Sequence, residues 1–158
     1  MANNEMQVER GLDLERYMGR WYEIASFPSR NQPKDGVNTR ATYTLRNDGT
    51  VQVLNETWSN GKRGHIEGTA FKSNRTSDEA KFKVKFYVPP FLPIIPVTGD
   101  YWVLFIDGDY QYALIGQPSR NCLWVSKPIC LLLFMFWSCL SFFSPGFNLL
   151  ANKFCHNP

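Results

Sequence analysis

Residue types that could carry covalent or metal chemistry are few and scattered. His65 and His156 are the only histidines, and neither has a cysteine or carboxylate at metal-ligand spacing. Asp107 and Asp109 flank a glycine, which is typical of a turn. The four cysteines form no C-x-x-C pair, and no nucleophile elbow or phosphate-binding glycine loop is present. We therefore expect no enzyme, metal or cofactor, and a binding function is favoured.

Composition indicates a single domain with a substantial interior. The chain has 158 residues, of which 44% are apolar and 15% aromatic. A net charge of +3 is too small to argue for a nucleic-acid partner. The charge is also unevenly distributed, because all 14 acidic residues precede residue 125. We expect a domain over residues 1–124, followed by a hydrophobic segment of different character over residues 125–158.

Short alternating segments separated by turn signals predict an all-β domain. Asn47–Gly49 and Ser59–Gly61 are strong turn signals, and no helical pattern interrupts the series. Eight such strands close into an antiparallel up-and-down barrel with room for one small ligand. An immunoglobulin-like sandwich and another small ligand-binding barrel are the alternatives. The expected strands are Trp21–Ala25, Thr39–Leu45, Val51–Trp58, His65–Lys72, Lys81–Phe86, Tyr101–Asp107, Tyr112–Gln117 and Asn121–Trp124.

Alternation within these strands predicts which side chains face the interior. Lys81–Phe86 has a clear period of two, so its apolar side chains are buried while its lysines stay in water. The same reasoning gives candidate cavity residues in sets rather than singly. They are Tyr43, Leu45, Val53, Phe82, Val84, Phe86, Val103 and Phe105.

Two motifs resemble the signatures of the lipocalin family. Gly19-Arg-Trp21 stands just before the first expected strand, and Asp100-Tyr101 stands at the expected distance downstream. The resemblance covers most of residues 11–124 and is closest to the branch of bacterial outer-membrane lipocalins, apolipoprotein D and plant temperature-induced lipocalins. It implies that Trp21 closes one end of the barrel. Gly19 is expected to permit a close backbone approach.

The connections at the expected open end include an unusually apolar segment. In an up-and-down barrel the loops after the first, third and fifth strands share the mouth. The first, Phe27–Asn38, is long enough for a lid, and Tyr87–Val97 is apolar and stiffened by four prolines. We expect this second segment to be a loop that touches a membrane surface; the alternative is that it packs on the barrel. The membrane-contact candidates are Phe91, Leu92, Ile94 and Ile95.

The C-terminal segment departs from the family pattern after Trp124. Family members continue with an arginine that covers the signature tryptophan, then with a helix over the barrel. Here Pro128 occupies the arginine position, and Lys127 lies one residue early, facing the opposite side. The cation–π cover and the helix are therefore expected to be absent or replaced. Ile129–Phe143 is strongly apolar, and it is a translated non-coding extension, a hydrophobic tail anchor or a substitute core element.

The resemblance implies a function that the residues alone do not demonstrate. It is the binding of a small apolar ligand, such as a fatty acid or lysolipid, by a peripheral membrane protein linked to temperature and oxidative stress. The N-terminus lacks a signal-peptide pattern, so we expect the cytosol or the cytoplasmic face of the plasma membrane. The alternatives are a membrane-tethered structural protein without ligand, a non-functional truncated isoform and, more remotely, an enzyme acting on an apolar substrate.

Overall fold

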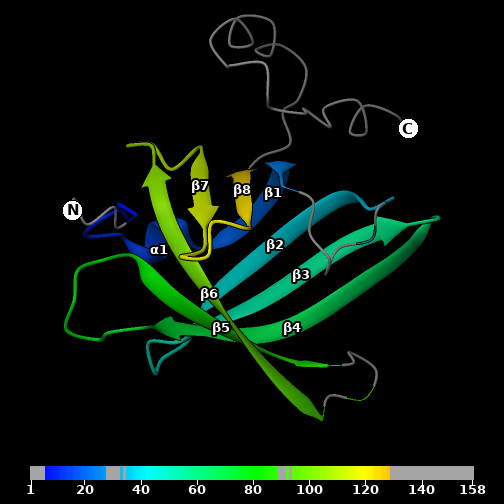
Figure 1. The fold of residues 1–158 in the computed structure, drawn as a ribbon, viewed down its shortest axis with the longest axis horizontal. Coiled ribbons are helices and arrows are strands. Elements are labelled where there is room, and N and C mark those ends of the chain that lie inside the picture. The colour runs from blue at the N-terminus through cyan, green and yellow to red at the C-terminus, as the bar shows by residue number, and fades with distance from the viewer. Residues whose placement is uncertain (1–5, 28–32, 34, 89–91, 93, 129–158) are drawn as a thin grey trace, which may run out of the picture.

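The computed structural model describes residues 6–27, 33, 35–88, 92 and 94–128. A single short helix, α1 (Leu14–Tyr17), precedes eight strands (Figure 1). The strands are β1 (Gly19–Ser26), β2 (Val37–Leu45), β3 (Val51–Ser59), β4 (Lys62–Lys72), β5 (Lys81–Val88), β6 (Ile95–Ile106), β7 (Ala113–Gly116) and β8 (Leu123–Lys127). All eight expected strands are present, with shifted ends.

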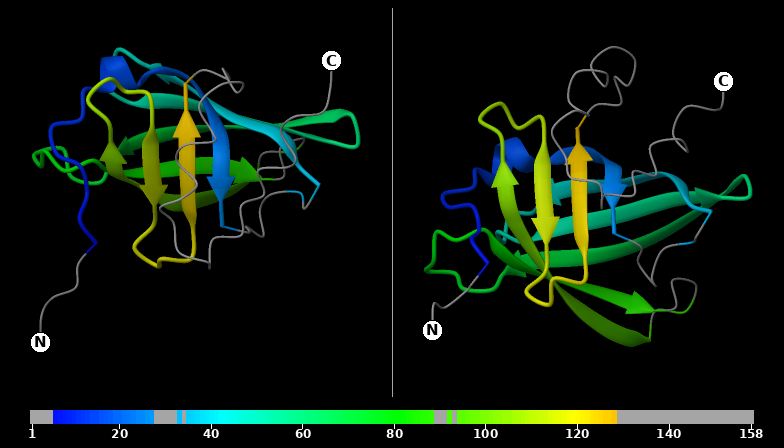
Figure 2. Two further views of the ribbon diagram at one scale, coloured as in Figure 1. Left: turned by 90° about the horizontal axis from the view of Figure 1, so that it is seen from above. Right: turned by 45° about the horizontal axis from the view of Figure 1, so that its top comes forward.

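The strands form a closed antiparallel barrel in sequence order, which confirms the predicted fold class (Figure 2). Each strand pairs with the next along the chain, and β8 returns to pair with β1 between Trp124–Lys127 and Tyr22–Ser26. The barrel therefore closes without any element beyond Lys127. Strand β8 also continues past Trp124, where the change in composition begins. Residues 129–158, including Ile129–Phe143, lie outside the described residues, and the three interpretations of that segment stay predictions.

Helix α1 lies against the end of the barrel where β1 begins (Figure 1). Asp13 caps it, because its carboxylate accepts hydrogen bonds from the backbone N–H groups of Glu15 and Arg16. The Arg16 guanidinium reaches across to the Gly108 carbonyl at 2.9 Å, and the Tyr110 hydroxyl accepts from the Asp13 N–H at 3.0 Å. These contacts tie α1 to the β6–β7 turn and keep this end of the barrel covered.

The apolar core lies at this closed end, in two groups of buried side chains. One contains Tyr17, Trp21, Ala80, Phe82, Val103, Ala113 and Ile115. The other contains Val51, Val53, Ala70 and Val84. As expected, Phe82 and Val84 of β5 are buried, while Lys83 between them is exposed.

The expectation that Tyr87–Val97 is entirely a loop is wrong at both ends. Tyr87 and Val88 complete β5, and Ile95–Val97 begin β6, with Tyr87 opposite Pro96. A proline is tolerated there because it lies beside the start of a strand, where it removes a single donor from the ladder. The β5–β6 ribbon consequently extends further toward the mouth than the sequence suggested (Figure 2, right).

Gly68 of β4 is required by a close approach between neighbouring strands. A Cβ atom at this position would lie 2.5 Å from Cδ1 of Phe86 and 2.7 Å from the Lys85 carbonyl oxygen. Gly68→Ala is therefore expected to lower the free energy of unfolding by about 1–3 kcal/mol in urea denaturation. Gly64→Ala in the same strand is the matched control, since its Cβ would meet nothing nearer than 3.8 Å. Equal effects of the two substitutions would contradict this account.

Candidate functional site

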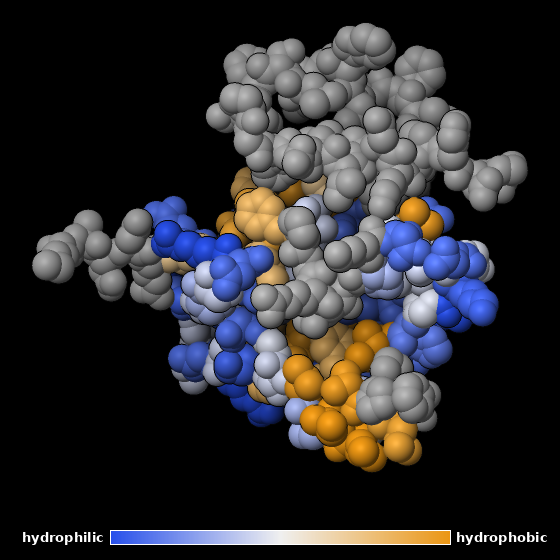
Figure 3. Space-filling view, turned by 45° about the vertical axis from the view of Figure 1, so that its right-hand side comes forward, coloured by the Kyte–Doolittle hydropathy of each residue, from blue (hydrophilic) through white to orange (hydrophobic). Residues whose placement is uncertain are grey.

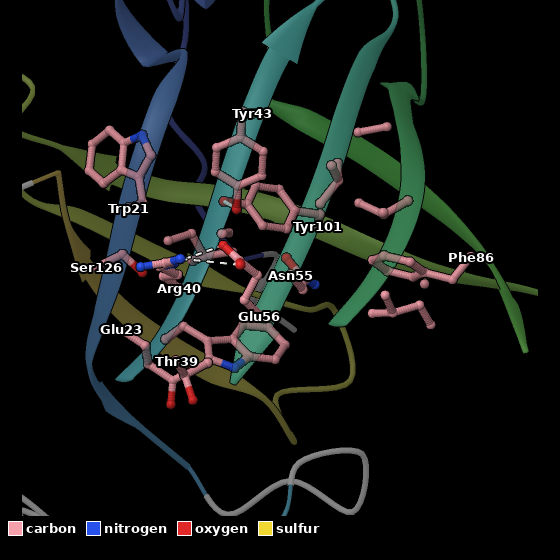
Figure 4. Close-up of a pocket in the computed structure, with 18 of the residues that line it drawn as sticks. Trp21, Glu23, Thr39, Arg40, Tyr43, Asn55, Glu56, Phe86, Tyr101 and Ser126 are labelled. Atoms are coloured by element: carbon pink, nitrogen blue, oxygen red, sulfur yellow. Dashed lines mark hydrogen bonds and ion pairs between the residues drawn. The ribbon is translucent and has the colours of Figure 1, made fainter. Parts of the chain in front are cut away.

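The barrel encloses a cavity of about 810 Å³. This volume lies within the usual range for sites that bind small molecules, roughly 300–1,000 Å³. Its wall is mainly apolar and aromatic, and side chains from most of the strands converge on it (Figure 4). The apolar and aromatic lining residues include Trp21, Ala41, Tyr43, Val51, Val53, Ala70, Phe82, Val84, Phe86, Tyr101, Ile115 and Trp124.

The candidate cavity residues fall into two groups. Five of the eight line the cavity, namely Tyr43, Val53, Phe82, Val84 and Phe86. Val103 is instead fully buried in the first group of core side chains. Leu45 is half-buried and packs against the second group. Neither Leu45 nor Val103 contributes to the cavity wall.

The expectation that Phe105 faces the cavity is wrong. Phe105 is 52% exposed, although it lies two residues after the buried Val103. The cause is a bulge: Val103 pairs with Ile115, but Phe105 pairs with Leu114, so β6 carries an extra residue between them. An extra residue in one strand reverses the faces of the positions that follow it.

Trp21 forms part of the cavity floor at the closed end. Its side chain is 2% exposed, its ring stacks on that of Tyr17 with 4.8 Å between centroids, and its indole N–H donates to the Tyr17 carbonyl at 2.9 Å. Gly19 does not serve the close approach that we expected, since no atom lies within 4 Å of where its Cβ would be. Instead its φ of +102° lies in a region that side chains disfavour, so glycine is needed for the backbone path into β1.

Three tyrosine hydroxyls meet beside Trp21. The Tyr101 hydroxyl lies 2.7 Å from that of Tyr17 and 3.0 Å from that of Tyr43. Burial is the main cause that raises the pKa of all three phenols, that of Tyr43 to about 12. Sequence reasoning used Tyr101 only as part of a signature and missed Tyr17. The signal that could have found Tyr17 is its place one helical turn before Trp21.

Both residues of the second signature contribute to the cavity wall. Tyr101 points into the cavity, where Figure 4 shows its ring beside that of Tyr43. Asp100 forms an ion pair with Lys83 on the neighbouring strand, at 3.0 Å. Toward the mouth the wall becomes more polar, with Glu23, Asn55 and Ser126 among its lining residues. The Glu23 carboxylate accepts a hydrogen bond from the Ser26 hydroxyl at 2.6 Å.

A buried carboxylate holds β2, β3 and β4 together. Glu56 is 4% exposed and accepts hydrogen bonds from Arg40 at 2.7 and 3.1 Å and from Arg63 at 2.6 Å. The bonds from Arg40 are the main cause that lowers the pKa of Glu56, and they raise the pKa of Arg40 in turn. Arg40 and Glu56 are cross-strand neighbours, and both belong to the residues that line the cavity (Figure 4).

The mouth of the barrel carries exposed apolar side chains on the β5–β6 ribbon. Ile94 is 65% exposed and Leu92 53%, and Tyr87, Ile95 and Val97 are also exposed. Figure 3 shows a hydrophobic area in the lower part of this face of the molecule. The fourth membrane-contact candidate, Phe91, lies outside the described residues. Most of the expected lid does too, since residues 28–32 and 34 are not described.

The remaining expectations concern metals, membrane spans and the cover over Trp21. Within the described part of the chain, no three His, Cys, Asp or Glu side chains group as metal ligands would, and no helix is long and apolar enough to cross a bilayer. Lys127 lies over the Tyr112 ring, 4.9 Å from its centroid, and donates to the Tyr112 hydroxyl at 3.2 Å. Its charge therefore rests on an outer aromatic ring rather than on Trp21.

Raising the pH is expected to destabilise the barrel through the buried phenols of Tyr17, Tyr43 and Tyr101. A folded-state pKa above the ordinary value of 10.0 means that the stabilisation is complete below about pH 10 and is lost as the pH rises toward 12. For Tyr43 the loss is about 1.4 kcal/mol per pH unit within this window. Urea unfolding across the window should show a steeper decline for the wild type than for Tyr43→Phe. Parallel declines would contradict the assignment.

Comparison with known proteins gives one consistent result. Residues 12–127 match the family model for a lipocalin-like domain. Over 121 residues the chain is 78% identical to temperature-induced lipocalin-1 of Arabidopsis thaliana, a match that covers 77% of this chain and 65% of that protein. Apolipoprotein D of Cavia porcellus is 39% identical over 119 residues, covering 75% of this chain and 57% of its own length.

A bacterial protein and a solved structure give further matches. The outer-membrane lipoprotein Blc of Escherichia coli K12 is 36% identical over 121 residues, covering 75% of this chain and 63% of Blc. The solved structure of insecticyanin from the tobacco hornworm Manduca sexta superimposes with a TM-score of 0.66 at 23% identity, covering 82% of this chain and 70% of that one. The closed barrel, its cavity and these matches together establish that the chain belongs to the lipocalin family.

Proposed function

We propose that this lipocalin binds one small apolar molecule, such as a fatty acid or a lysolipid, and acts as a carrier or scavenger rather than as an enzyme. The observation that carries the proposal is the 810 Å³ cavity with its mainly apolar wall. Burial of apolar surface in a largely preformed cavity supplies the driving force, and no covalent step is needed. We further propose a role in tolerance of temperature and oxidative stress, and the likeness to temperature-induced lipocalin-1 supports the link to temperature.

The apolar mouth supports a place of action at a membrane surface. Leu92, Ile94 and Ile95 are exposed and lie between or beside Val88 and Val97, which line the cavity at the ends of β5 and β6. Inserting such side chains into a bilayer gives weak and reversible attachment, because each contributes at most roughly 1.5–3 kcal/mol. We propose that the protein works as a peripheral membrane protein on the cytoplasmic face of the plasma membrane. A membrane-tethered structural protein without ligand is the second candidate, and the same surface supports it.

Ligand binding is tested by calorimetric titration of the full chain with laurate below its micelle concentration. We expect saturation near one laurate per chain. Ala41→Trp places a large ring in the cavity and should weaken binding by about tenfold or more. Thr44→Trp is the matched control, because it adds the same ring to an exposed position of the same strand. Unsaturable binding, or equal binding by both variants, would favour the structural role without ligand.

Membrane contact is tested by sedimentation with phosphatidylcholine vesicles. Ile94→Asp replaces the most exposed of these mouth side chains with a charge. We therefore expect the partition constant for vesicle binding to fall by about tenfold. Phe71→Asp is the control, since Phe71 is also exposed but pairs with Lys83, away from the mouth. If both variants sediment like the wild type, the mouth does not contact the bilayer.

A further inference from the structure

We infer that the three tyrosines at the cavity floor form a receptor for one neutral hydrogen-bond acceptor, so that an apolar ligand with a carbonyl or hydroxyl group enters polar end first. The inference rests on the proposed function and adds the ligand's chemical class and its orientation. It concerns Tyr17, Tyr43 and Tyr101, all of which line the cavity.

The first argument is a count of hydrogen-bond donors. Each phenol carries one O–H donor, so the three hydroxyls supply three donors. The structure contains two bonds among them, Tyr17 to Tyr101 and Tyr101 to Tyr43, and each bond uses one donor. However the hydroxyls are oriented, one donor remains for a partner outside the group. A donor left unsatisfied in a buried place is costly, so this position favours an acceptor.

The second argument concerns where the remaining donor can find that acceptor. Tyr17 and Tyr43 stack with 5.6 Å between ring centroids, and Tyr17 also stacks on Trp21. These rings close the floor on the α1 side. Figure 4 shows Tyr43 and Tyr101 pointing toward each other within the cavity. The acceptor must therefore come from the cavity itself, which is where a ligand lies.

The third argument concerns charge. Within the described part of the chain, burial and the three phenols themselves shift the pKa values of Tyr17, Tyr43 and Tyr101, and no lysine or arginine contributes. All three phenols stay neutral donors at physiological pH. A carboxylate brought to this floor would lose its hydration beside three neutral phenols, which is expensive. A ketone, aldehyde, ester or alcohol is neutral and loses much less hydration free energy when it is buried.

Two classes of ligand are therefore expected to bind in opposite directions. A neutral molecule with one polar end places that end on the tyrosines and its tail toward the mouth. A fatty acid places its tail on the floor and leaves its carboxylate in water at the mouth. Removing the hydroxyls should weaken the binding of the first class only, because the floor then becomes more apolar.

The experiment compares two probes on the full chain: methyl undecyl ketone and laurate, which have tails of similar length. The variant is the triple substitution Tyr17→Phe, Tyr43→Phe and Tyr101→Phe, which removes three hydroxyls and little volume. Replacing all the partners of a buried hydrogen bond by apolar groups of the same shape is often nearly neutral for stability. Tyr112→Phe is the control, because its hydroxyl accepts from Lys127 on the outer surface.

We expect the triple variant to bind the ketone about two- to tenfold more weakly, with laurate affinity unchanged or higher. The infrared carbonyl stretching frequency of the ketone bound to the wild type should be lower than that of the ketone dissolved in an alkane. In the triple variant the frequency of the bound ketone should return to the alkane value. Asn55→Leu removes a different polar group from the cavity wall and should leave the frequency lowered. This comparison also tests the proposal if the triple variant does not fold.

Each other outcome is decisive. Saturable ketone binding with equal affinity and carbonyl frequency in the wild type and the triple variant would overturn the inference and leave the proposed function intact. Loss of the frequency shift in Asn55→Leu would assign the contact to Asn55 instead. If the wild type bound neither probe at one per chain, the proposed function would fail and the inference with it.

Discussion

The pairing of the last strand with the first is the interaction on which the rest of the structure depends. β8 has only five residues, yet its ladder with β1 converts an open sheet into a barrel without exposed edges. The backbone N–H of Phe27 continues this contact by donating to the Leu123 carbonyl at 3.0 Å. Only after closure do the inner faces of eight strands enclose one space. The apolar floor, the cavity and the separation of inside from outside all follow from it.

Ion pairs between neighbouring strands reinforce this closure. Arg40 and Arg63 hold Glu56 across three strands, and Lys83 holds Asp100 across two. Arg40, Glu56 and Asp100 also line the cavity, so these charges in its mainly apolar wall are paired. Because these pairs are cross-strand neighbours, they also favour the register that closes the barrel.

Sequence alone predicted the parts of this protein that depend on local pattern. The alternation of Lys81–Phe86, the turn at Asn47–Gly49 and the Gly19-x-Trp21 motif gave the strand order and the family. Phe105 was misplaced because a bulge in β6 has no signature in the chain. Gly19 was expected to allow a close approach, but the structure needs it for a backbone angle. Both requirements select glycine, so the sequence cannot distinguish them. The tyrosine group joins an α1 residue, a β2 residue and a β6 residue, and only tertiary structure brings them together.

The barrel is sealed by α1 and Trp21 at one end, and this has a kinetic consequence. A ligand that entered at the other end would leave through the same opening, so association and dissociation would pass it in opposite order. The last atoms to enter would be the first to leave, and they would pass the exposed side chains of the β5–β6 ribbon. The residence time of a ligand would then depend on the shape and composition of the mouth more than on the depth of the cavity. Exchange rate and affinity are thus governed by different residues, and selection can alter either one separately.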